Sequence, residues 1–260
     1  MISSNDNSLL KRLLSSFILI IIALTLNFTG GIILLIFVLI LSYILLYEFY
    51  SITNIGIKTL PFYLTVSLFF FTITISFSNF YILSFIPVLV TLIFMGIFFK
   101  LTVWSYVAIF YLLIPLSILI ALRMHLDLGV YMIFWCFIIV WSADSLSYLI
   151  GKSVGGPLLW KKVSPNKTWS GFWGGIIGAT FIGYFSSSIM PINIVYPILI
   201  SFLCGMMVAF GDLFESMLKR SSGLKDSSRV LPGHGGLLDR IDGVMAGLPL
   251  FAWLLLTRPL

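Results

Sequence analysis

The sequence predicts an all-α, polytopic integral membrane protein with about nine transmembrane helices and a cytoplasmic N-terminus. Hydrophobic residues make up 60% of the chain and charged residues only 9%, whereas soluble domains are roughly half apolar and about a quarter charged. Four stretches carry no charge at all: residues 13–47, 59–99, 101–122 and 168–211. They are apolar on every face, which excludes the alternating strands of a transmembrane barrel.

Turn residues divide the longer charge-free runs into pairs of spans, because one membrane helix needs only about 20 apolar residues. The predicted breaks lie at 27–31, 76–79 and 190–193, where Asn, Gly, Ser and Pro gather. Two further apolar stretches, 129–149 and 243–257, complete the set of nine spans.

The distribution of positive charge predicts the orientation. With the N-terminus in the cytoplasm, every Lys and Arg except Arg123 and Arg258 lies on the cytoplasmic side, as the positive-inside rule expects. The net charge of +6 is therefore mainly a topology signal, and the chain offers no soluble basic face for nucleic acid. In a bacterial cell this topology corresponds to the inner membrane, with loops 150–170 and 213–242 facing the cytoplasm.

Acidic residues gather at one predicted depth, the inner membrane interface. Asp144 and Asp212 lie near the cytoplasmic ends of their helices, and Asp239 and Asp242 open the last helix with a spacing that puts them on one face. Each acid could instead form a structural ion pair with a nearby Lys or Arg. Four at one depth favour a functional site, because acids at membrane helices are costly.

If the helix that contains Asp212 continues past the membrane, Asp212, Glu215, Ser216 and Lys219 share one of its faces. Together with the acids of the last helix they would form an oxygen-rich cluster of the kind that Mg²⁺ binds with substrate phosphates. Zinc is excluded, because His125 and His234 lie in loops on opposite sides of the membrane and both cysteines fall inside predicted spans.

Basic and glycine-rich segments supply groups for phosphate. His234, Gly235 and Gly236 lead into the last helix, where a close backbone approach and free N–H groups suit an anion. A tight turn without a ligand is the structural alternative. The surrounding charges favour phosphate: Lys219, Arg220, Lys225 and Arg240. In the other loop, Ser164 and Pro165 predict a helix N-cap and first residue, which places Lys167 and Thr168 at the start of that helix.

The segment from Ser216 to Asp242 resembles the signature of the phosphatidate cytidylyltransferase (CDP-diacylglycerol synthase) family. That signature reads Ser, two residues, Lys-Arg, a spacer, Lys-Asp, a spacer, Pro, one residue, His-Gly-Gly, two residues, Asp-Arg, one residue, Asp, and every position matches. The upstream segment is similar to the family's Ser-Pro-Lys-Lys-Thr-Trp-Glu-Gly, except that Asn166 replaces Lys and Ser170 replaces Glu. The resemblance runs from about residue 141 to the C-terminus.

The resemblance implies transfer of CMP from CTP to phosphatidate, giving CDP-diacylglycerol and diphosphate in phospholipid biosynthesis. We expect Mg²⁺ as cofactor, with a second cation left open, and metal ligation by Asp212, Asp239 and Asp242. The expected catalytic residues are Lys167, Asp212, Lys219, Arg220 and Asp239. The expected substrate-binding residues are Asp144, Ser164, Thr168, Ser216, Lys225, Asp226, His234, Gly235, Gly236 and Arg240.

On this interpretation residues 129–260 are the catalytic region. Residues 1–128 hold about five helices that form either a homodimer face or a lipid groove in the bilayer; the sequence does not choose between them. Two rival functions fit less well. A CDP-alcohol phosphotransferase would need an Arg where Gly247 stands and further acids after Asp242. A transporter would place its acids near the midplane, often with internal repeats.

Overall fold

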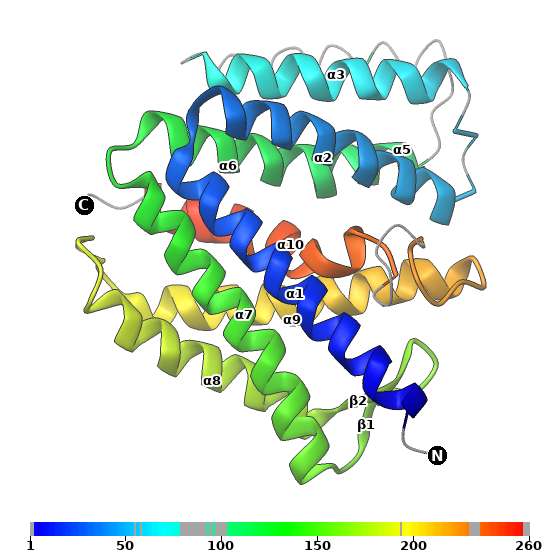
Figure 1. The fold of residues 1–260 in the computed structure, drawn as a ribbon, viewed down its shortest axis with the longest axis vertical. Coiled ribbons are helices and arrows are strands. Elements are labelled where there is room, and N and C mark those ends of the chain that lie inside the picture. Colours follow the sequence, from blue (N-terminus) through cyan, green and yellow to red (C-terminus); the bar gives the residue numbers. More distant parts are fainter. Residues whose placement is uncertain are drawn as a thin grey trace.

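The structure is a computed structural model, and it describes residues 3–54, 56, 57, 59–78, 93, 96, 103–192, 194–228 and 235–256, with side chains from residue 16 to residue 255 of these ranges. Helices and one short hairpin of strands make up the described fold (Figure 1). The elements are α1 (Ser3–Thr29), α2 (Gly31–Ile52), α3 (Leu60–Phe77), α5 (Val103–Ala108), the π-helical segment η1 (Ile109–Leu113), α6 (Ile114–His125), α7 (Gly129–Val154), β1 (Leu158–Trp160), β2 (Ser164–Thr168), α8 (Trp169–Ser187), α9 (Pro197–Ser221) and α10 (Leu238–Leu256).

The helices end where turn residues were predicted to break the charge-free runs. Gly30 separates α1 from α2 and has a φ of 59°. Glycine suits this position, because other residues rarely adopt a positive φ. α3 ends at Phe77, and residues 188–196 separate α8 from α9. These breaks are confirmed. The second span predicted within 59–99 lies largely outside the described residues.

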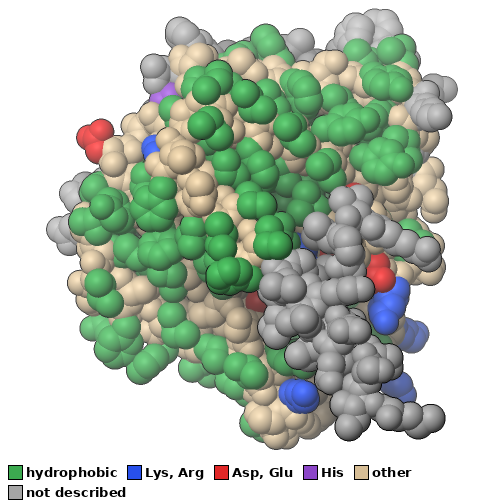
Figure 2. All heavy atoms as spheres, in the orientation of Figure 1, with side chains coloured by type: hydrophobic (Ala, Val, Ile, Leu, Met, Phe, Trp, Pro, Cys, Tyr) green, Lys and Arg blue, Asp and Glu red, His purple; other side chains and the backbone are tan. Residues whose placement is uncertain are grey.

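Within the residues that the structure describes, five helices are long and apolar enough to cross a membrane: α2, α3, the continuous helix Val103–His125, α7 and α9. Large hydrophobic side chains such as Ile33, Phe71 and Phe181 lie exposed on the helix surfaces. Hydrophobic side chains are spread over much of the described face seen in Figure 2, while most of the visible Lys and Arg lie toward its lower right. The chain is therefore an α-helical membrane protein, since an aqueous solvent would not tolerate so wide an apolar surface.

The helices of the C-terminal region pack closely on one another. α7 packs on α8, α9 and α10, and α9 packs on α8 and α10. α10 also contacts α6 and α2 of the N-terminal region (Figure 1). Glycines bring α7 and α8 together: a Cβ at Gly171 would lie 2.6 Å from the Ser147 carbonyl oxygen, and one at Gly175 would lie 2.8 Å from that of Ala143. This approach places the C-terminal half of α7, with Asp144, beside the start of α8.

The start of α8 differs from the prediction. Ser164 and Pro165 do not begin a helix but lie in β2, which pairs antiparallel with β1, and the fold is therefore not purely α-helical. The residue before a proline disfavours the helical region, and here the hairpin provides an extended partner. α8 begins at Trp169, where the Thr168 hydroxyl accepts a hydrogen bond from Gly171 N at 3.1 Å. Thr168 is thus the actual N-cap.

Candidate active site

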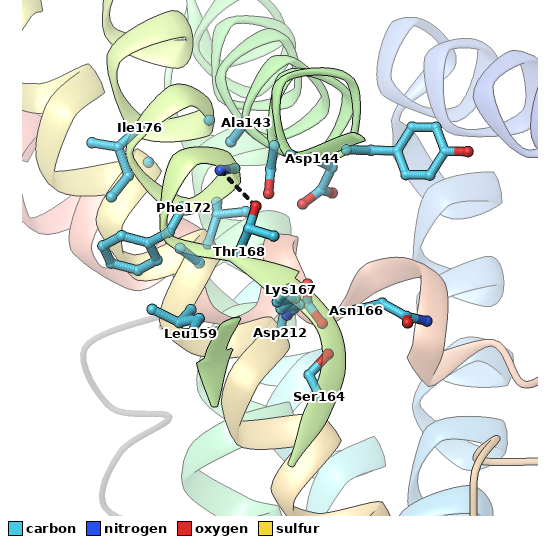
Figure 3. A pocket seen from close by; sticks show the side chains of 18 of the residues that line it. Ala143, Asp144, Leu159, Ser164, Asn166, Lys167, Thr168, Phe172, Ile176 and Asp212 are labelled. Atoms are coloured by element: carbon cyan, nitrogen blue, oxygen red, sulfur yellow. Dashed lines mark hydrogen bonds and ion pairs between the residues drawn. The ribbon is translucent and has the colours of Figure 1, made fainter. Parts of the chain in front are cut away.

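A cavity of about 690 Å³ lies where α7, the hairpin, α8, α9 and α10 meet (Figure 3). Eight of the residues predicted to form the site line it: Asp144, Ser164, Lys167, Thr168, Asp212, Asp239, Arg240 and Asp242. They come from four elements and both predicted loops, which the fold brings together. Asn166, one of the two departures from the family pattern, also lines the cavity.

Lys167 of β2 forms an ion pair with Asp212 of α9 (Figure 3). The two side chains remain 24% and 40% exposed, so water and a soluble ligand can reach both charges. Partly exposed pairs of this kind contribute little to stability, about 0–1 kcal/mol. The Lys167–Asp212 pair can therefore be separated at little cost in stability.

A second, buried ion pair joins α9 to α10. Lys219 bonds Asp239 and lies 3.4 Å from Glu215, and the three side chains are only 12%, 7% and 1% exposed. The predicted continuation of the helix past Asp212 is confirmed, since α9 runs to Ser221. Burial alone would raise the pKa of Asp239, but hydrogen bonds with Glu215 and Lys219 and the charge of Lys219 lower it to about 2.

The second oxygen of Asp239 is also fully used. Oδ2 accepts hydrogen bonds from Ser227 N at 3.0 Å, from Ser227 Oγ at 2.9 Å and from Gly236 N at 2.9 Å. Gly235 has a φ of +86°, and a Cβ there would lie 2.9 Å from the same oxygen. The glycines predicted to approach phosphate thus wrap the Asp239 carboxylate, and they are not among the residues that line the cavity.

Besides Asp239, the cavity is lined by the carboxylates of Asp144, Asp212 and Asp242, from α7, α9 and α10, and Asp242 is 9% exposed. A close approach of α9 and α10 brings two of them near: a Cβ at Gly211 would lie 3.1 Å from the Asp242 carbonyl oxygen. Carboxylate oxygens are the donors that Mg²⁺ takes. Within the described part of the chain, no three His, Cys, Asp or Glu side chains are close enough to hold a metal by themselves, so a cation here would share its ligands with substrate or water.

Several predicted residues lie away from the cavity lining. Arg220 donates to the backbone carbonyls of Val163 at 3.3 Å and Leu224 at 3.0 Å, which ties α9 to the hairpin and to the following turn. Lys225 and Asp226 are exposed, and Ser216 and Lys219 do not line the cavity. His234 lies outside the described residues, so its role stays a prediction.

Sequence reasoning missed some residues of this region. Tyr148 and Lys152 line the cavity from α7, with the Lys152 ammonium 5.8 Å from the Tyr148 ring centroid. Glu48 of α2 and Ser227 bond the segments around Asp239. Glu48 did carry a signal, because it is an acid at the end of a long apolar helix. Only acids of the C-terminal region were predicted to belong to a functional site.

Comparison with known proteins decides the family. The family model described as "Cytidylyltransferase family" matches residues 10–257, nearly the whole chain and both of its regions. The chain belongs to the cytidylyltransferase family. Its N-terminal helices are therefore part of the family's fold, which hydropathy alone did not indicate.

Curated relatives match about half of the chain. The phosphatidate cytidylyltransferase of Bacillus subtilis is 42% identical over 129 residues, 49% of this chain and 48% of the relative. That of Haemophilus influenzae is 43% identical over 131 residues, with coverage of 48% and 46%. That of Staphylococcus epidermidis is 42% identical over 130 residues, with coverage of 49% and 50%. The chain thus spans about half the length of the curated relatives it matches.

Proposed function

We propose that this protein transfers CMP from CTP to phosphatidate, forming CDP-diacylglycerol and releasing diphosphate. The observation that supports the proposal most is the composition of the cavity. Lys152, Lys167 and Arg240 line it together with the carboxylates of Asp144 and Asp242. Phosphoryl transfer depends mainly on positioning and on neutralising charge with cations, and this arrangement supplies groups for both. The named activity of the family's similar relatives agrees with this assignment.

The reaction balances without a protein nucleophile. A non-bridging oxygen of the phosphatidate phosphate attacks the α-phosphorus of CTP and forms a new P–O–P bond. The bond between the α-phosphorus and the oxygen bridging to the β-phosphorus breaks, and diphosphate leaves with that electron pair. The second pKa of a phosphomonoester is about 6, so the attacking oxygen is already ionised at pH 7 and no base has to remove a proton.

Each charged group of the site has a proposed role. Lys167, which is 24% exposed and paired with Asp212, meets the phosphates of CTP as a point charge, and Arg240 assists from α10. Lys219 is held by Glu215 and Asp239, so it fixes the site rather than contacting substrate. Arg220 holds the hairpin through its bonds to backbone carbonyls.

Asp212 and Asp242 would hold Mg²⁺, with Asp239 as the third predicted ligand. The donor chemistry fits, since hard carboxylate oxygens line the cavity beside the place proposed for the phosphates. The oxygens of Asp239 are engaged by Lys219, Ser227 and Gly236. We therefore favour Asp212 and Asp242 as the direct ligands of the cation. When bound, the cation would neutralise charge on the phosphate oxygens.

The membrane setting follows from the same reasoning. Phosphatidate arrives from the bilayer and CTP from water, so the two meet at an interface. We place the cavity at the cytoplasmic face, with nine spans and a cytoplasmic N-terminus, because this topology puts every Lys and Arg except Arg123 and Arg258 inside.

Reconstitution tests the proposed function. The full chain, in bilayer discs that contain phosphatidate, is given CTP and Mg²⁺, and both products are measured. We expect CDP-diacylglycerol and diphosphate in equal amounts, and none when diacylglycerol replaces phosphatidate or when a chelator removes the metal. A folded chain that forms no CDP-diacylglycerol would contradict the proposal, and one that consumes CDP-diacylglycerol with a free alcohol would favour the phosphotransferase rival.

A further inference from the structure

Glu48 is a fully buried acid at the end of α2, 0% exposed, and it contacts the segments around the proposed site. Its carboxylate accepts four hydrogen bonds, from Leu237 N at 3.0 Å, Leu238 N at 2.8 Å, Ser228 Oγ at 2.6 Å and Ser227 Oγ at 3.3 Å. All four donors lie about 180–190 positions later in the sequence. Glu48 therefore joins the N-terminal region to the start of α10.

The carboxylate suits its place at the start of a helix. The first N–H groups of a helix have no partner within the helix, and negative charge there is favoured by the helix dipole. Leu238 N is the first such group of α10, and Leu237 N lies directly before it. A Cβ at Gly236 would lie 2.8 Å and 2.9 Å from the two Glu48 oxygens, so the glycine leaves room for the carboxylate.

Ser227 bridges Glu48 and Asp239, the acid that is paired with Lys219. The Ser227 hydroxyl lies 3.3 Å from Glu48 Oε2 and 2.9 Å from Asp239 Oδ2, and Ser227 N also donates to Asp239. The turn at Ser227–Ser228 is thus held between the two acids. Any movement of Glu48 would displace the donors that orient Asp239 at the cavity wall.

We infer that Glu48 is a positioning residue for the proposed transfer, acting through Ser227 and the first turn of α10. The effect on transfer rests on the proposed function, whereas the orientation of Asp239 and of the start of α10 by Glu48 does not. Glu48 orients Asp239, and with it the helix turn that carries Asp242 into the cavity. A role confined to folding would predict that its removal lowers stability alone.

Hydrogen exchange and metal dependence separate these roles. The variants are Glu48→Ala, Glu48→Gln, which keeps one accepting oxygen, and Ser228→Ala, which removes one donor. The matched control is Ser42→Ala, because Ser42 is equally buried on α2 but bonds only Leu39 O within its own helix. Exchange is followed in a peptide covering 235–240 of the full chain in bilayer discs, and turnover is titrated with Mg²⁺.

We expect the amides of this peptide to exchange about 10- to 100-fold faster in Glu48→Ala, with smaller increases in Glu48→Gln and Ser228→Ala, because a lost charge-assisted bond is worth about that factor. The Mg²⁺ concentration for half-maximal turnover should rise in the same order, and Ser42→Ala should match the wild type in both. If Glu48→Ala does not fold, Ser228→Ala decides the matter.

Unchanged exchange and an unchanged Mg²⁺ requirement in the folded variants would overturn the inference. Faster exchange with an unchanged Mg²⁺ requirement would also overturn it, since Glu48 would then be a structural residue only. A wild-type chain without cytidylyltransferase activity would instead defeat the proposed function, and the exchange data would still show whether Glu48 holds the start of α10.

Discussion

The buried pair of Lys219 and Asp239 should couple α9 to α10 energetically. Removing one partner of a buried pair leaves a charge without compensation and costs about 3–5 kcal/mol. Asp239→Asn keeps an oxygen for the Ser227 and Gly236 donors, so we expect a loss of about 3 kcal/mol in the free energy of unfolding. Lys219→Met leaves both Glu215 and Asp239 without their cation, and we expect a loss of about 4–5 kcal/mol.

A double-mutant cycle measures the coupling itself. The wild type, both single variants and the double variant are unfolded reversibly from mixed micelles, and the free energies are compared. Because the side chains are only 12% and 7% exposed, we expect the double variant to lose about 2–3 kcal/mol less than the sum of the single losses. A coupling energy below about 0.5 kcal/mol would refute the argument that this pair joins the two helices.

Three further predictions concern the cavity and its walls. Asp212→Asn should lower turnover about 100-fold or more, because it removes a proposed metal ligand. Its free energy of unfolding should stay within about 0.5 kcal/mol of the wild type. A near-normal rate and Mg²⁺ dependence would exclude Asp212 from the metal site. Lys167→Ala should raise KM for CTP and lower kcat, whereas Lys167→Arg should retain part of the activity because it keeps the charge. Wild-type activity in both variants would mean that Lys167 serves only the membrane topology of the chain. Gly175→Ala should lower the free energy of unfolding by about 1–3 kcal/mol, because its Cβ would meet the Ala143 carbonyl at 2.8 Å. Gly205→Ala, whose Cβ would have ordinary contacts from 3.4 Å, should lower it less. Equal losses in the two variants would contradict the close packing of α7 on α8.

Much of the fold could be predicted from the sequence because it depends on local signals. Charge-free runs locate membrane helices, and Gly30 interrupts one of them with a positive φ that glycine adopts without strain. The shared face of Asp212 and Lys219 follows from helix geometry once α9 is known to continue. Such features need no knowledge of what packs against them.

Features that depend on distant partners could not be predicted. Pro165 is equally compatible with the first turn of a helix and with an extended strand, and the pairing of its strand β2 with β1 decides between them. Arg220 was expected at phosphate, and its additional bond to the carbonyl of Val163, 57 positions away, could not be read from a residue pattern. Glu48 meets donors from the other end of the chain, so its spacing to neighbouring residues carried no information.

The fate of the phosphorus atoms of CTP tests the proposed chemistry most directly. The reconstituted full chain is given CTP labelled at either the α- or the γ-phosphate, together with phosphatidate and Mg²⁺, and label is followed in lipid and in diphosphate. Attack of the phosphatidate oxygen on the α-phosphorus predicts that all transferred α-label appears in lipid and all released γ-label in diphosphate. Label from the γ-phosphate in the lipid, or α-label that remains in water-soluble products while CTP is consumed, would contradict the mechanism.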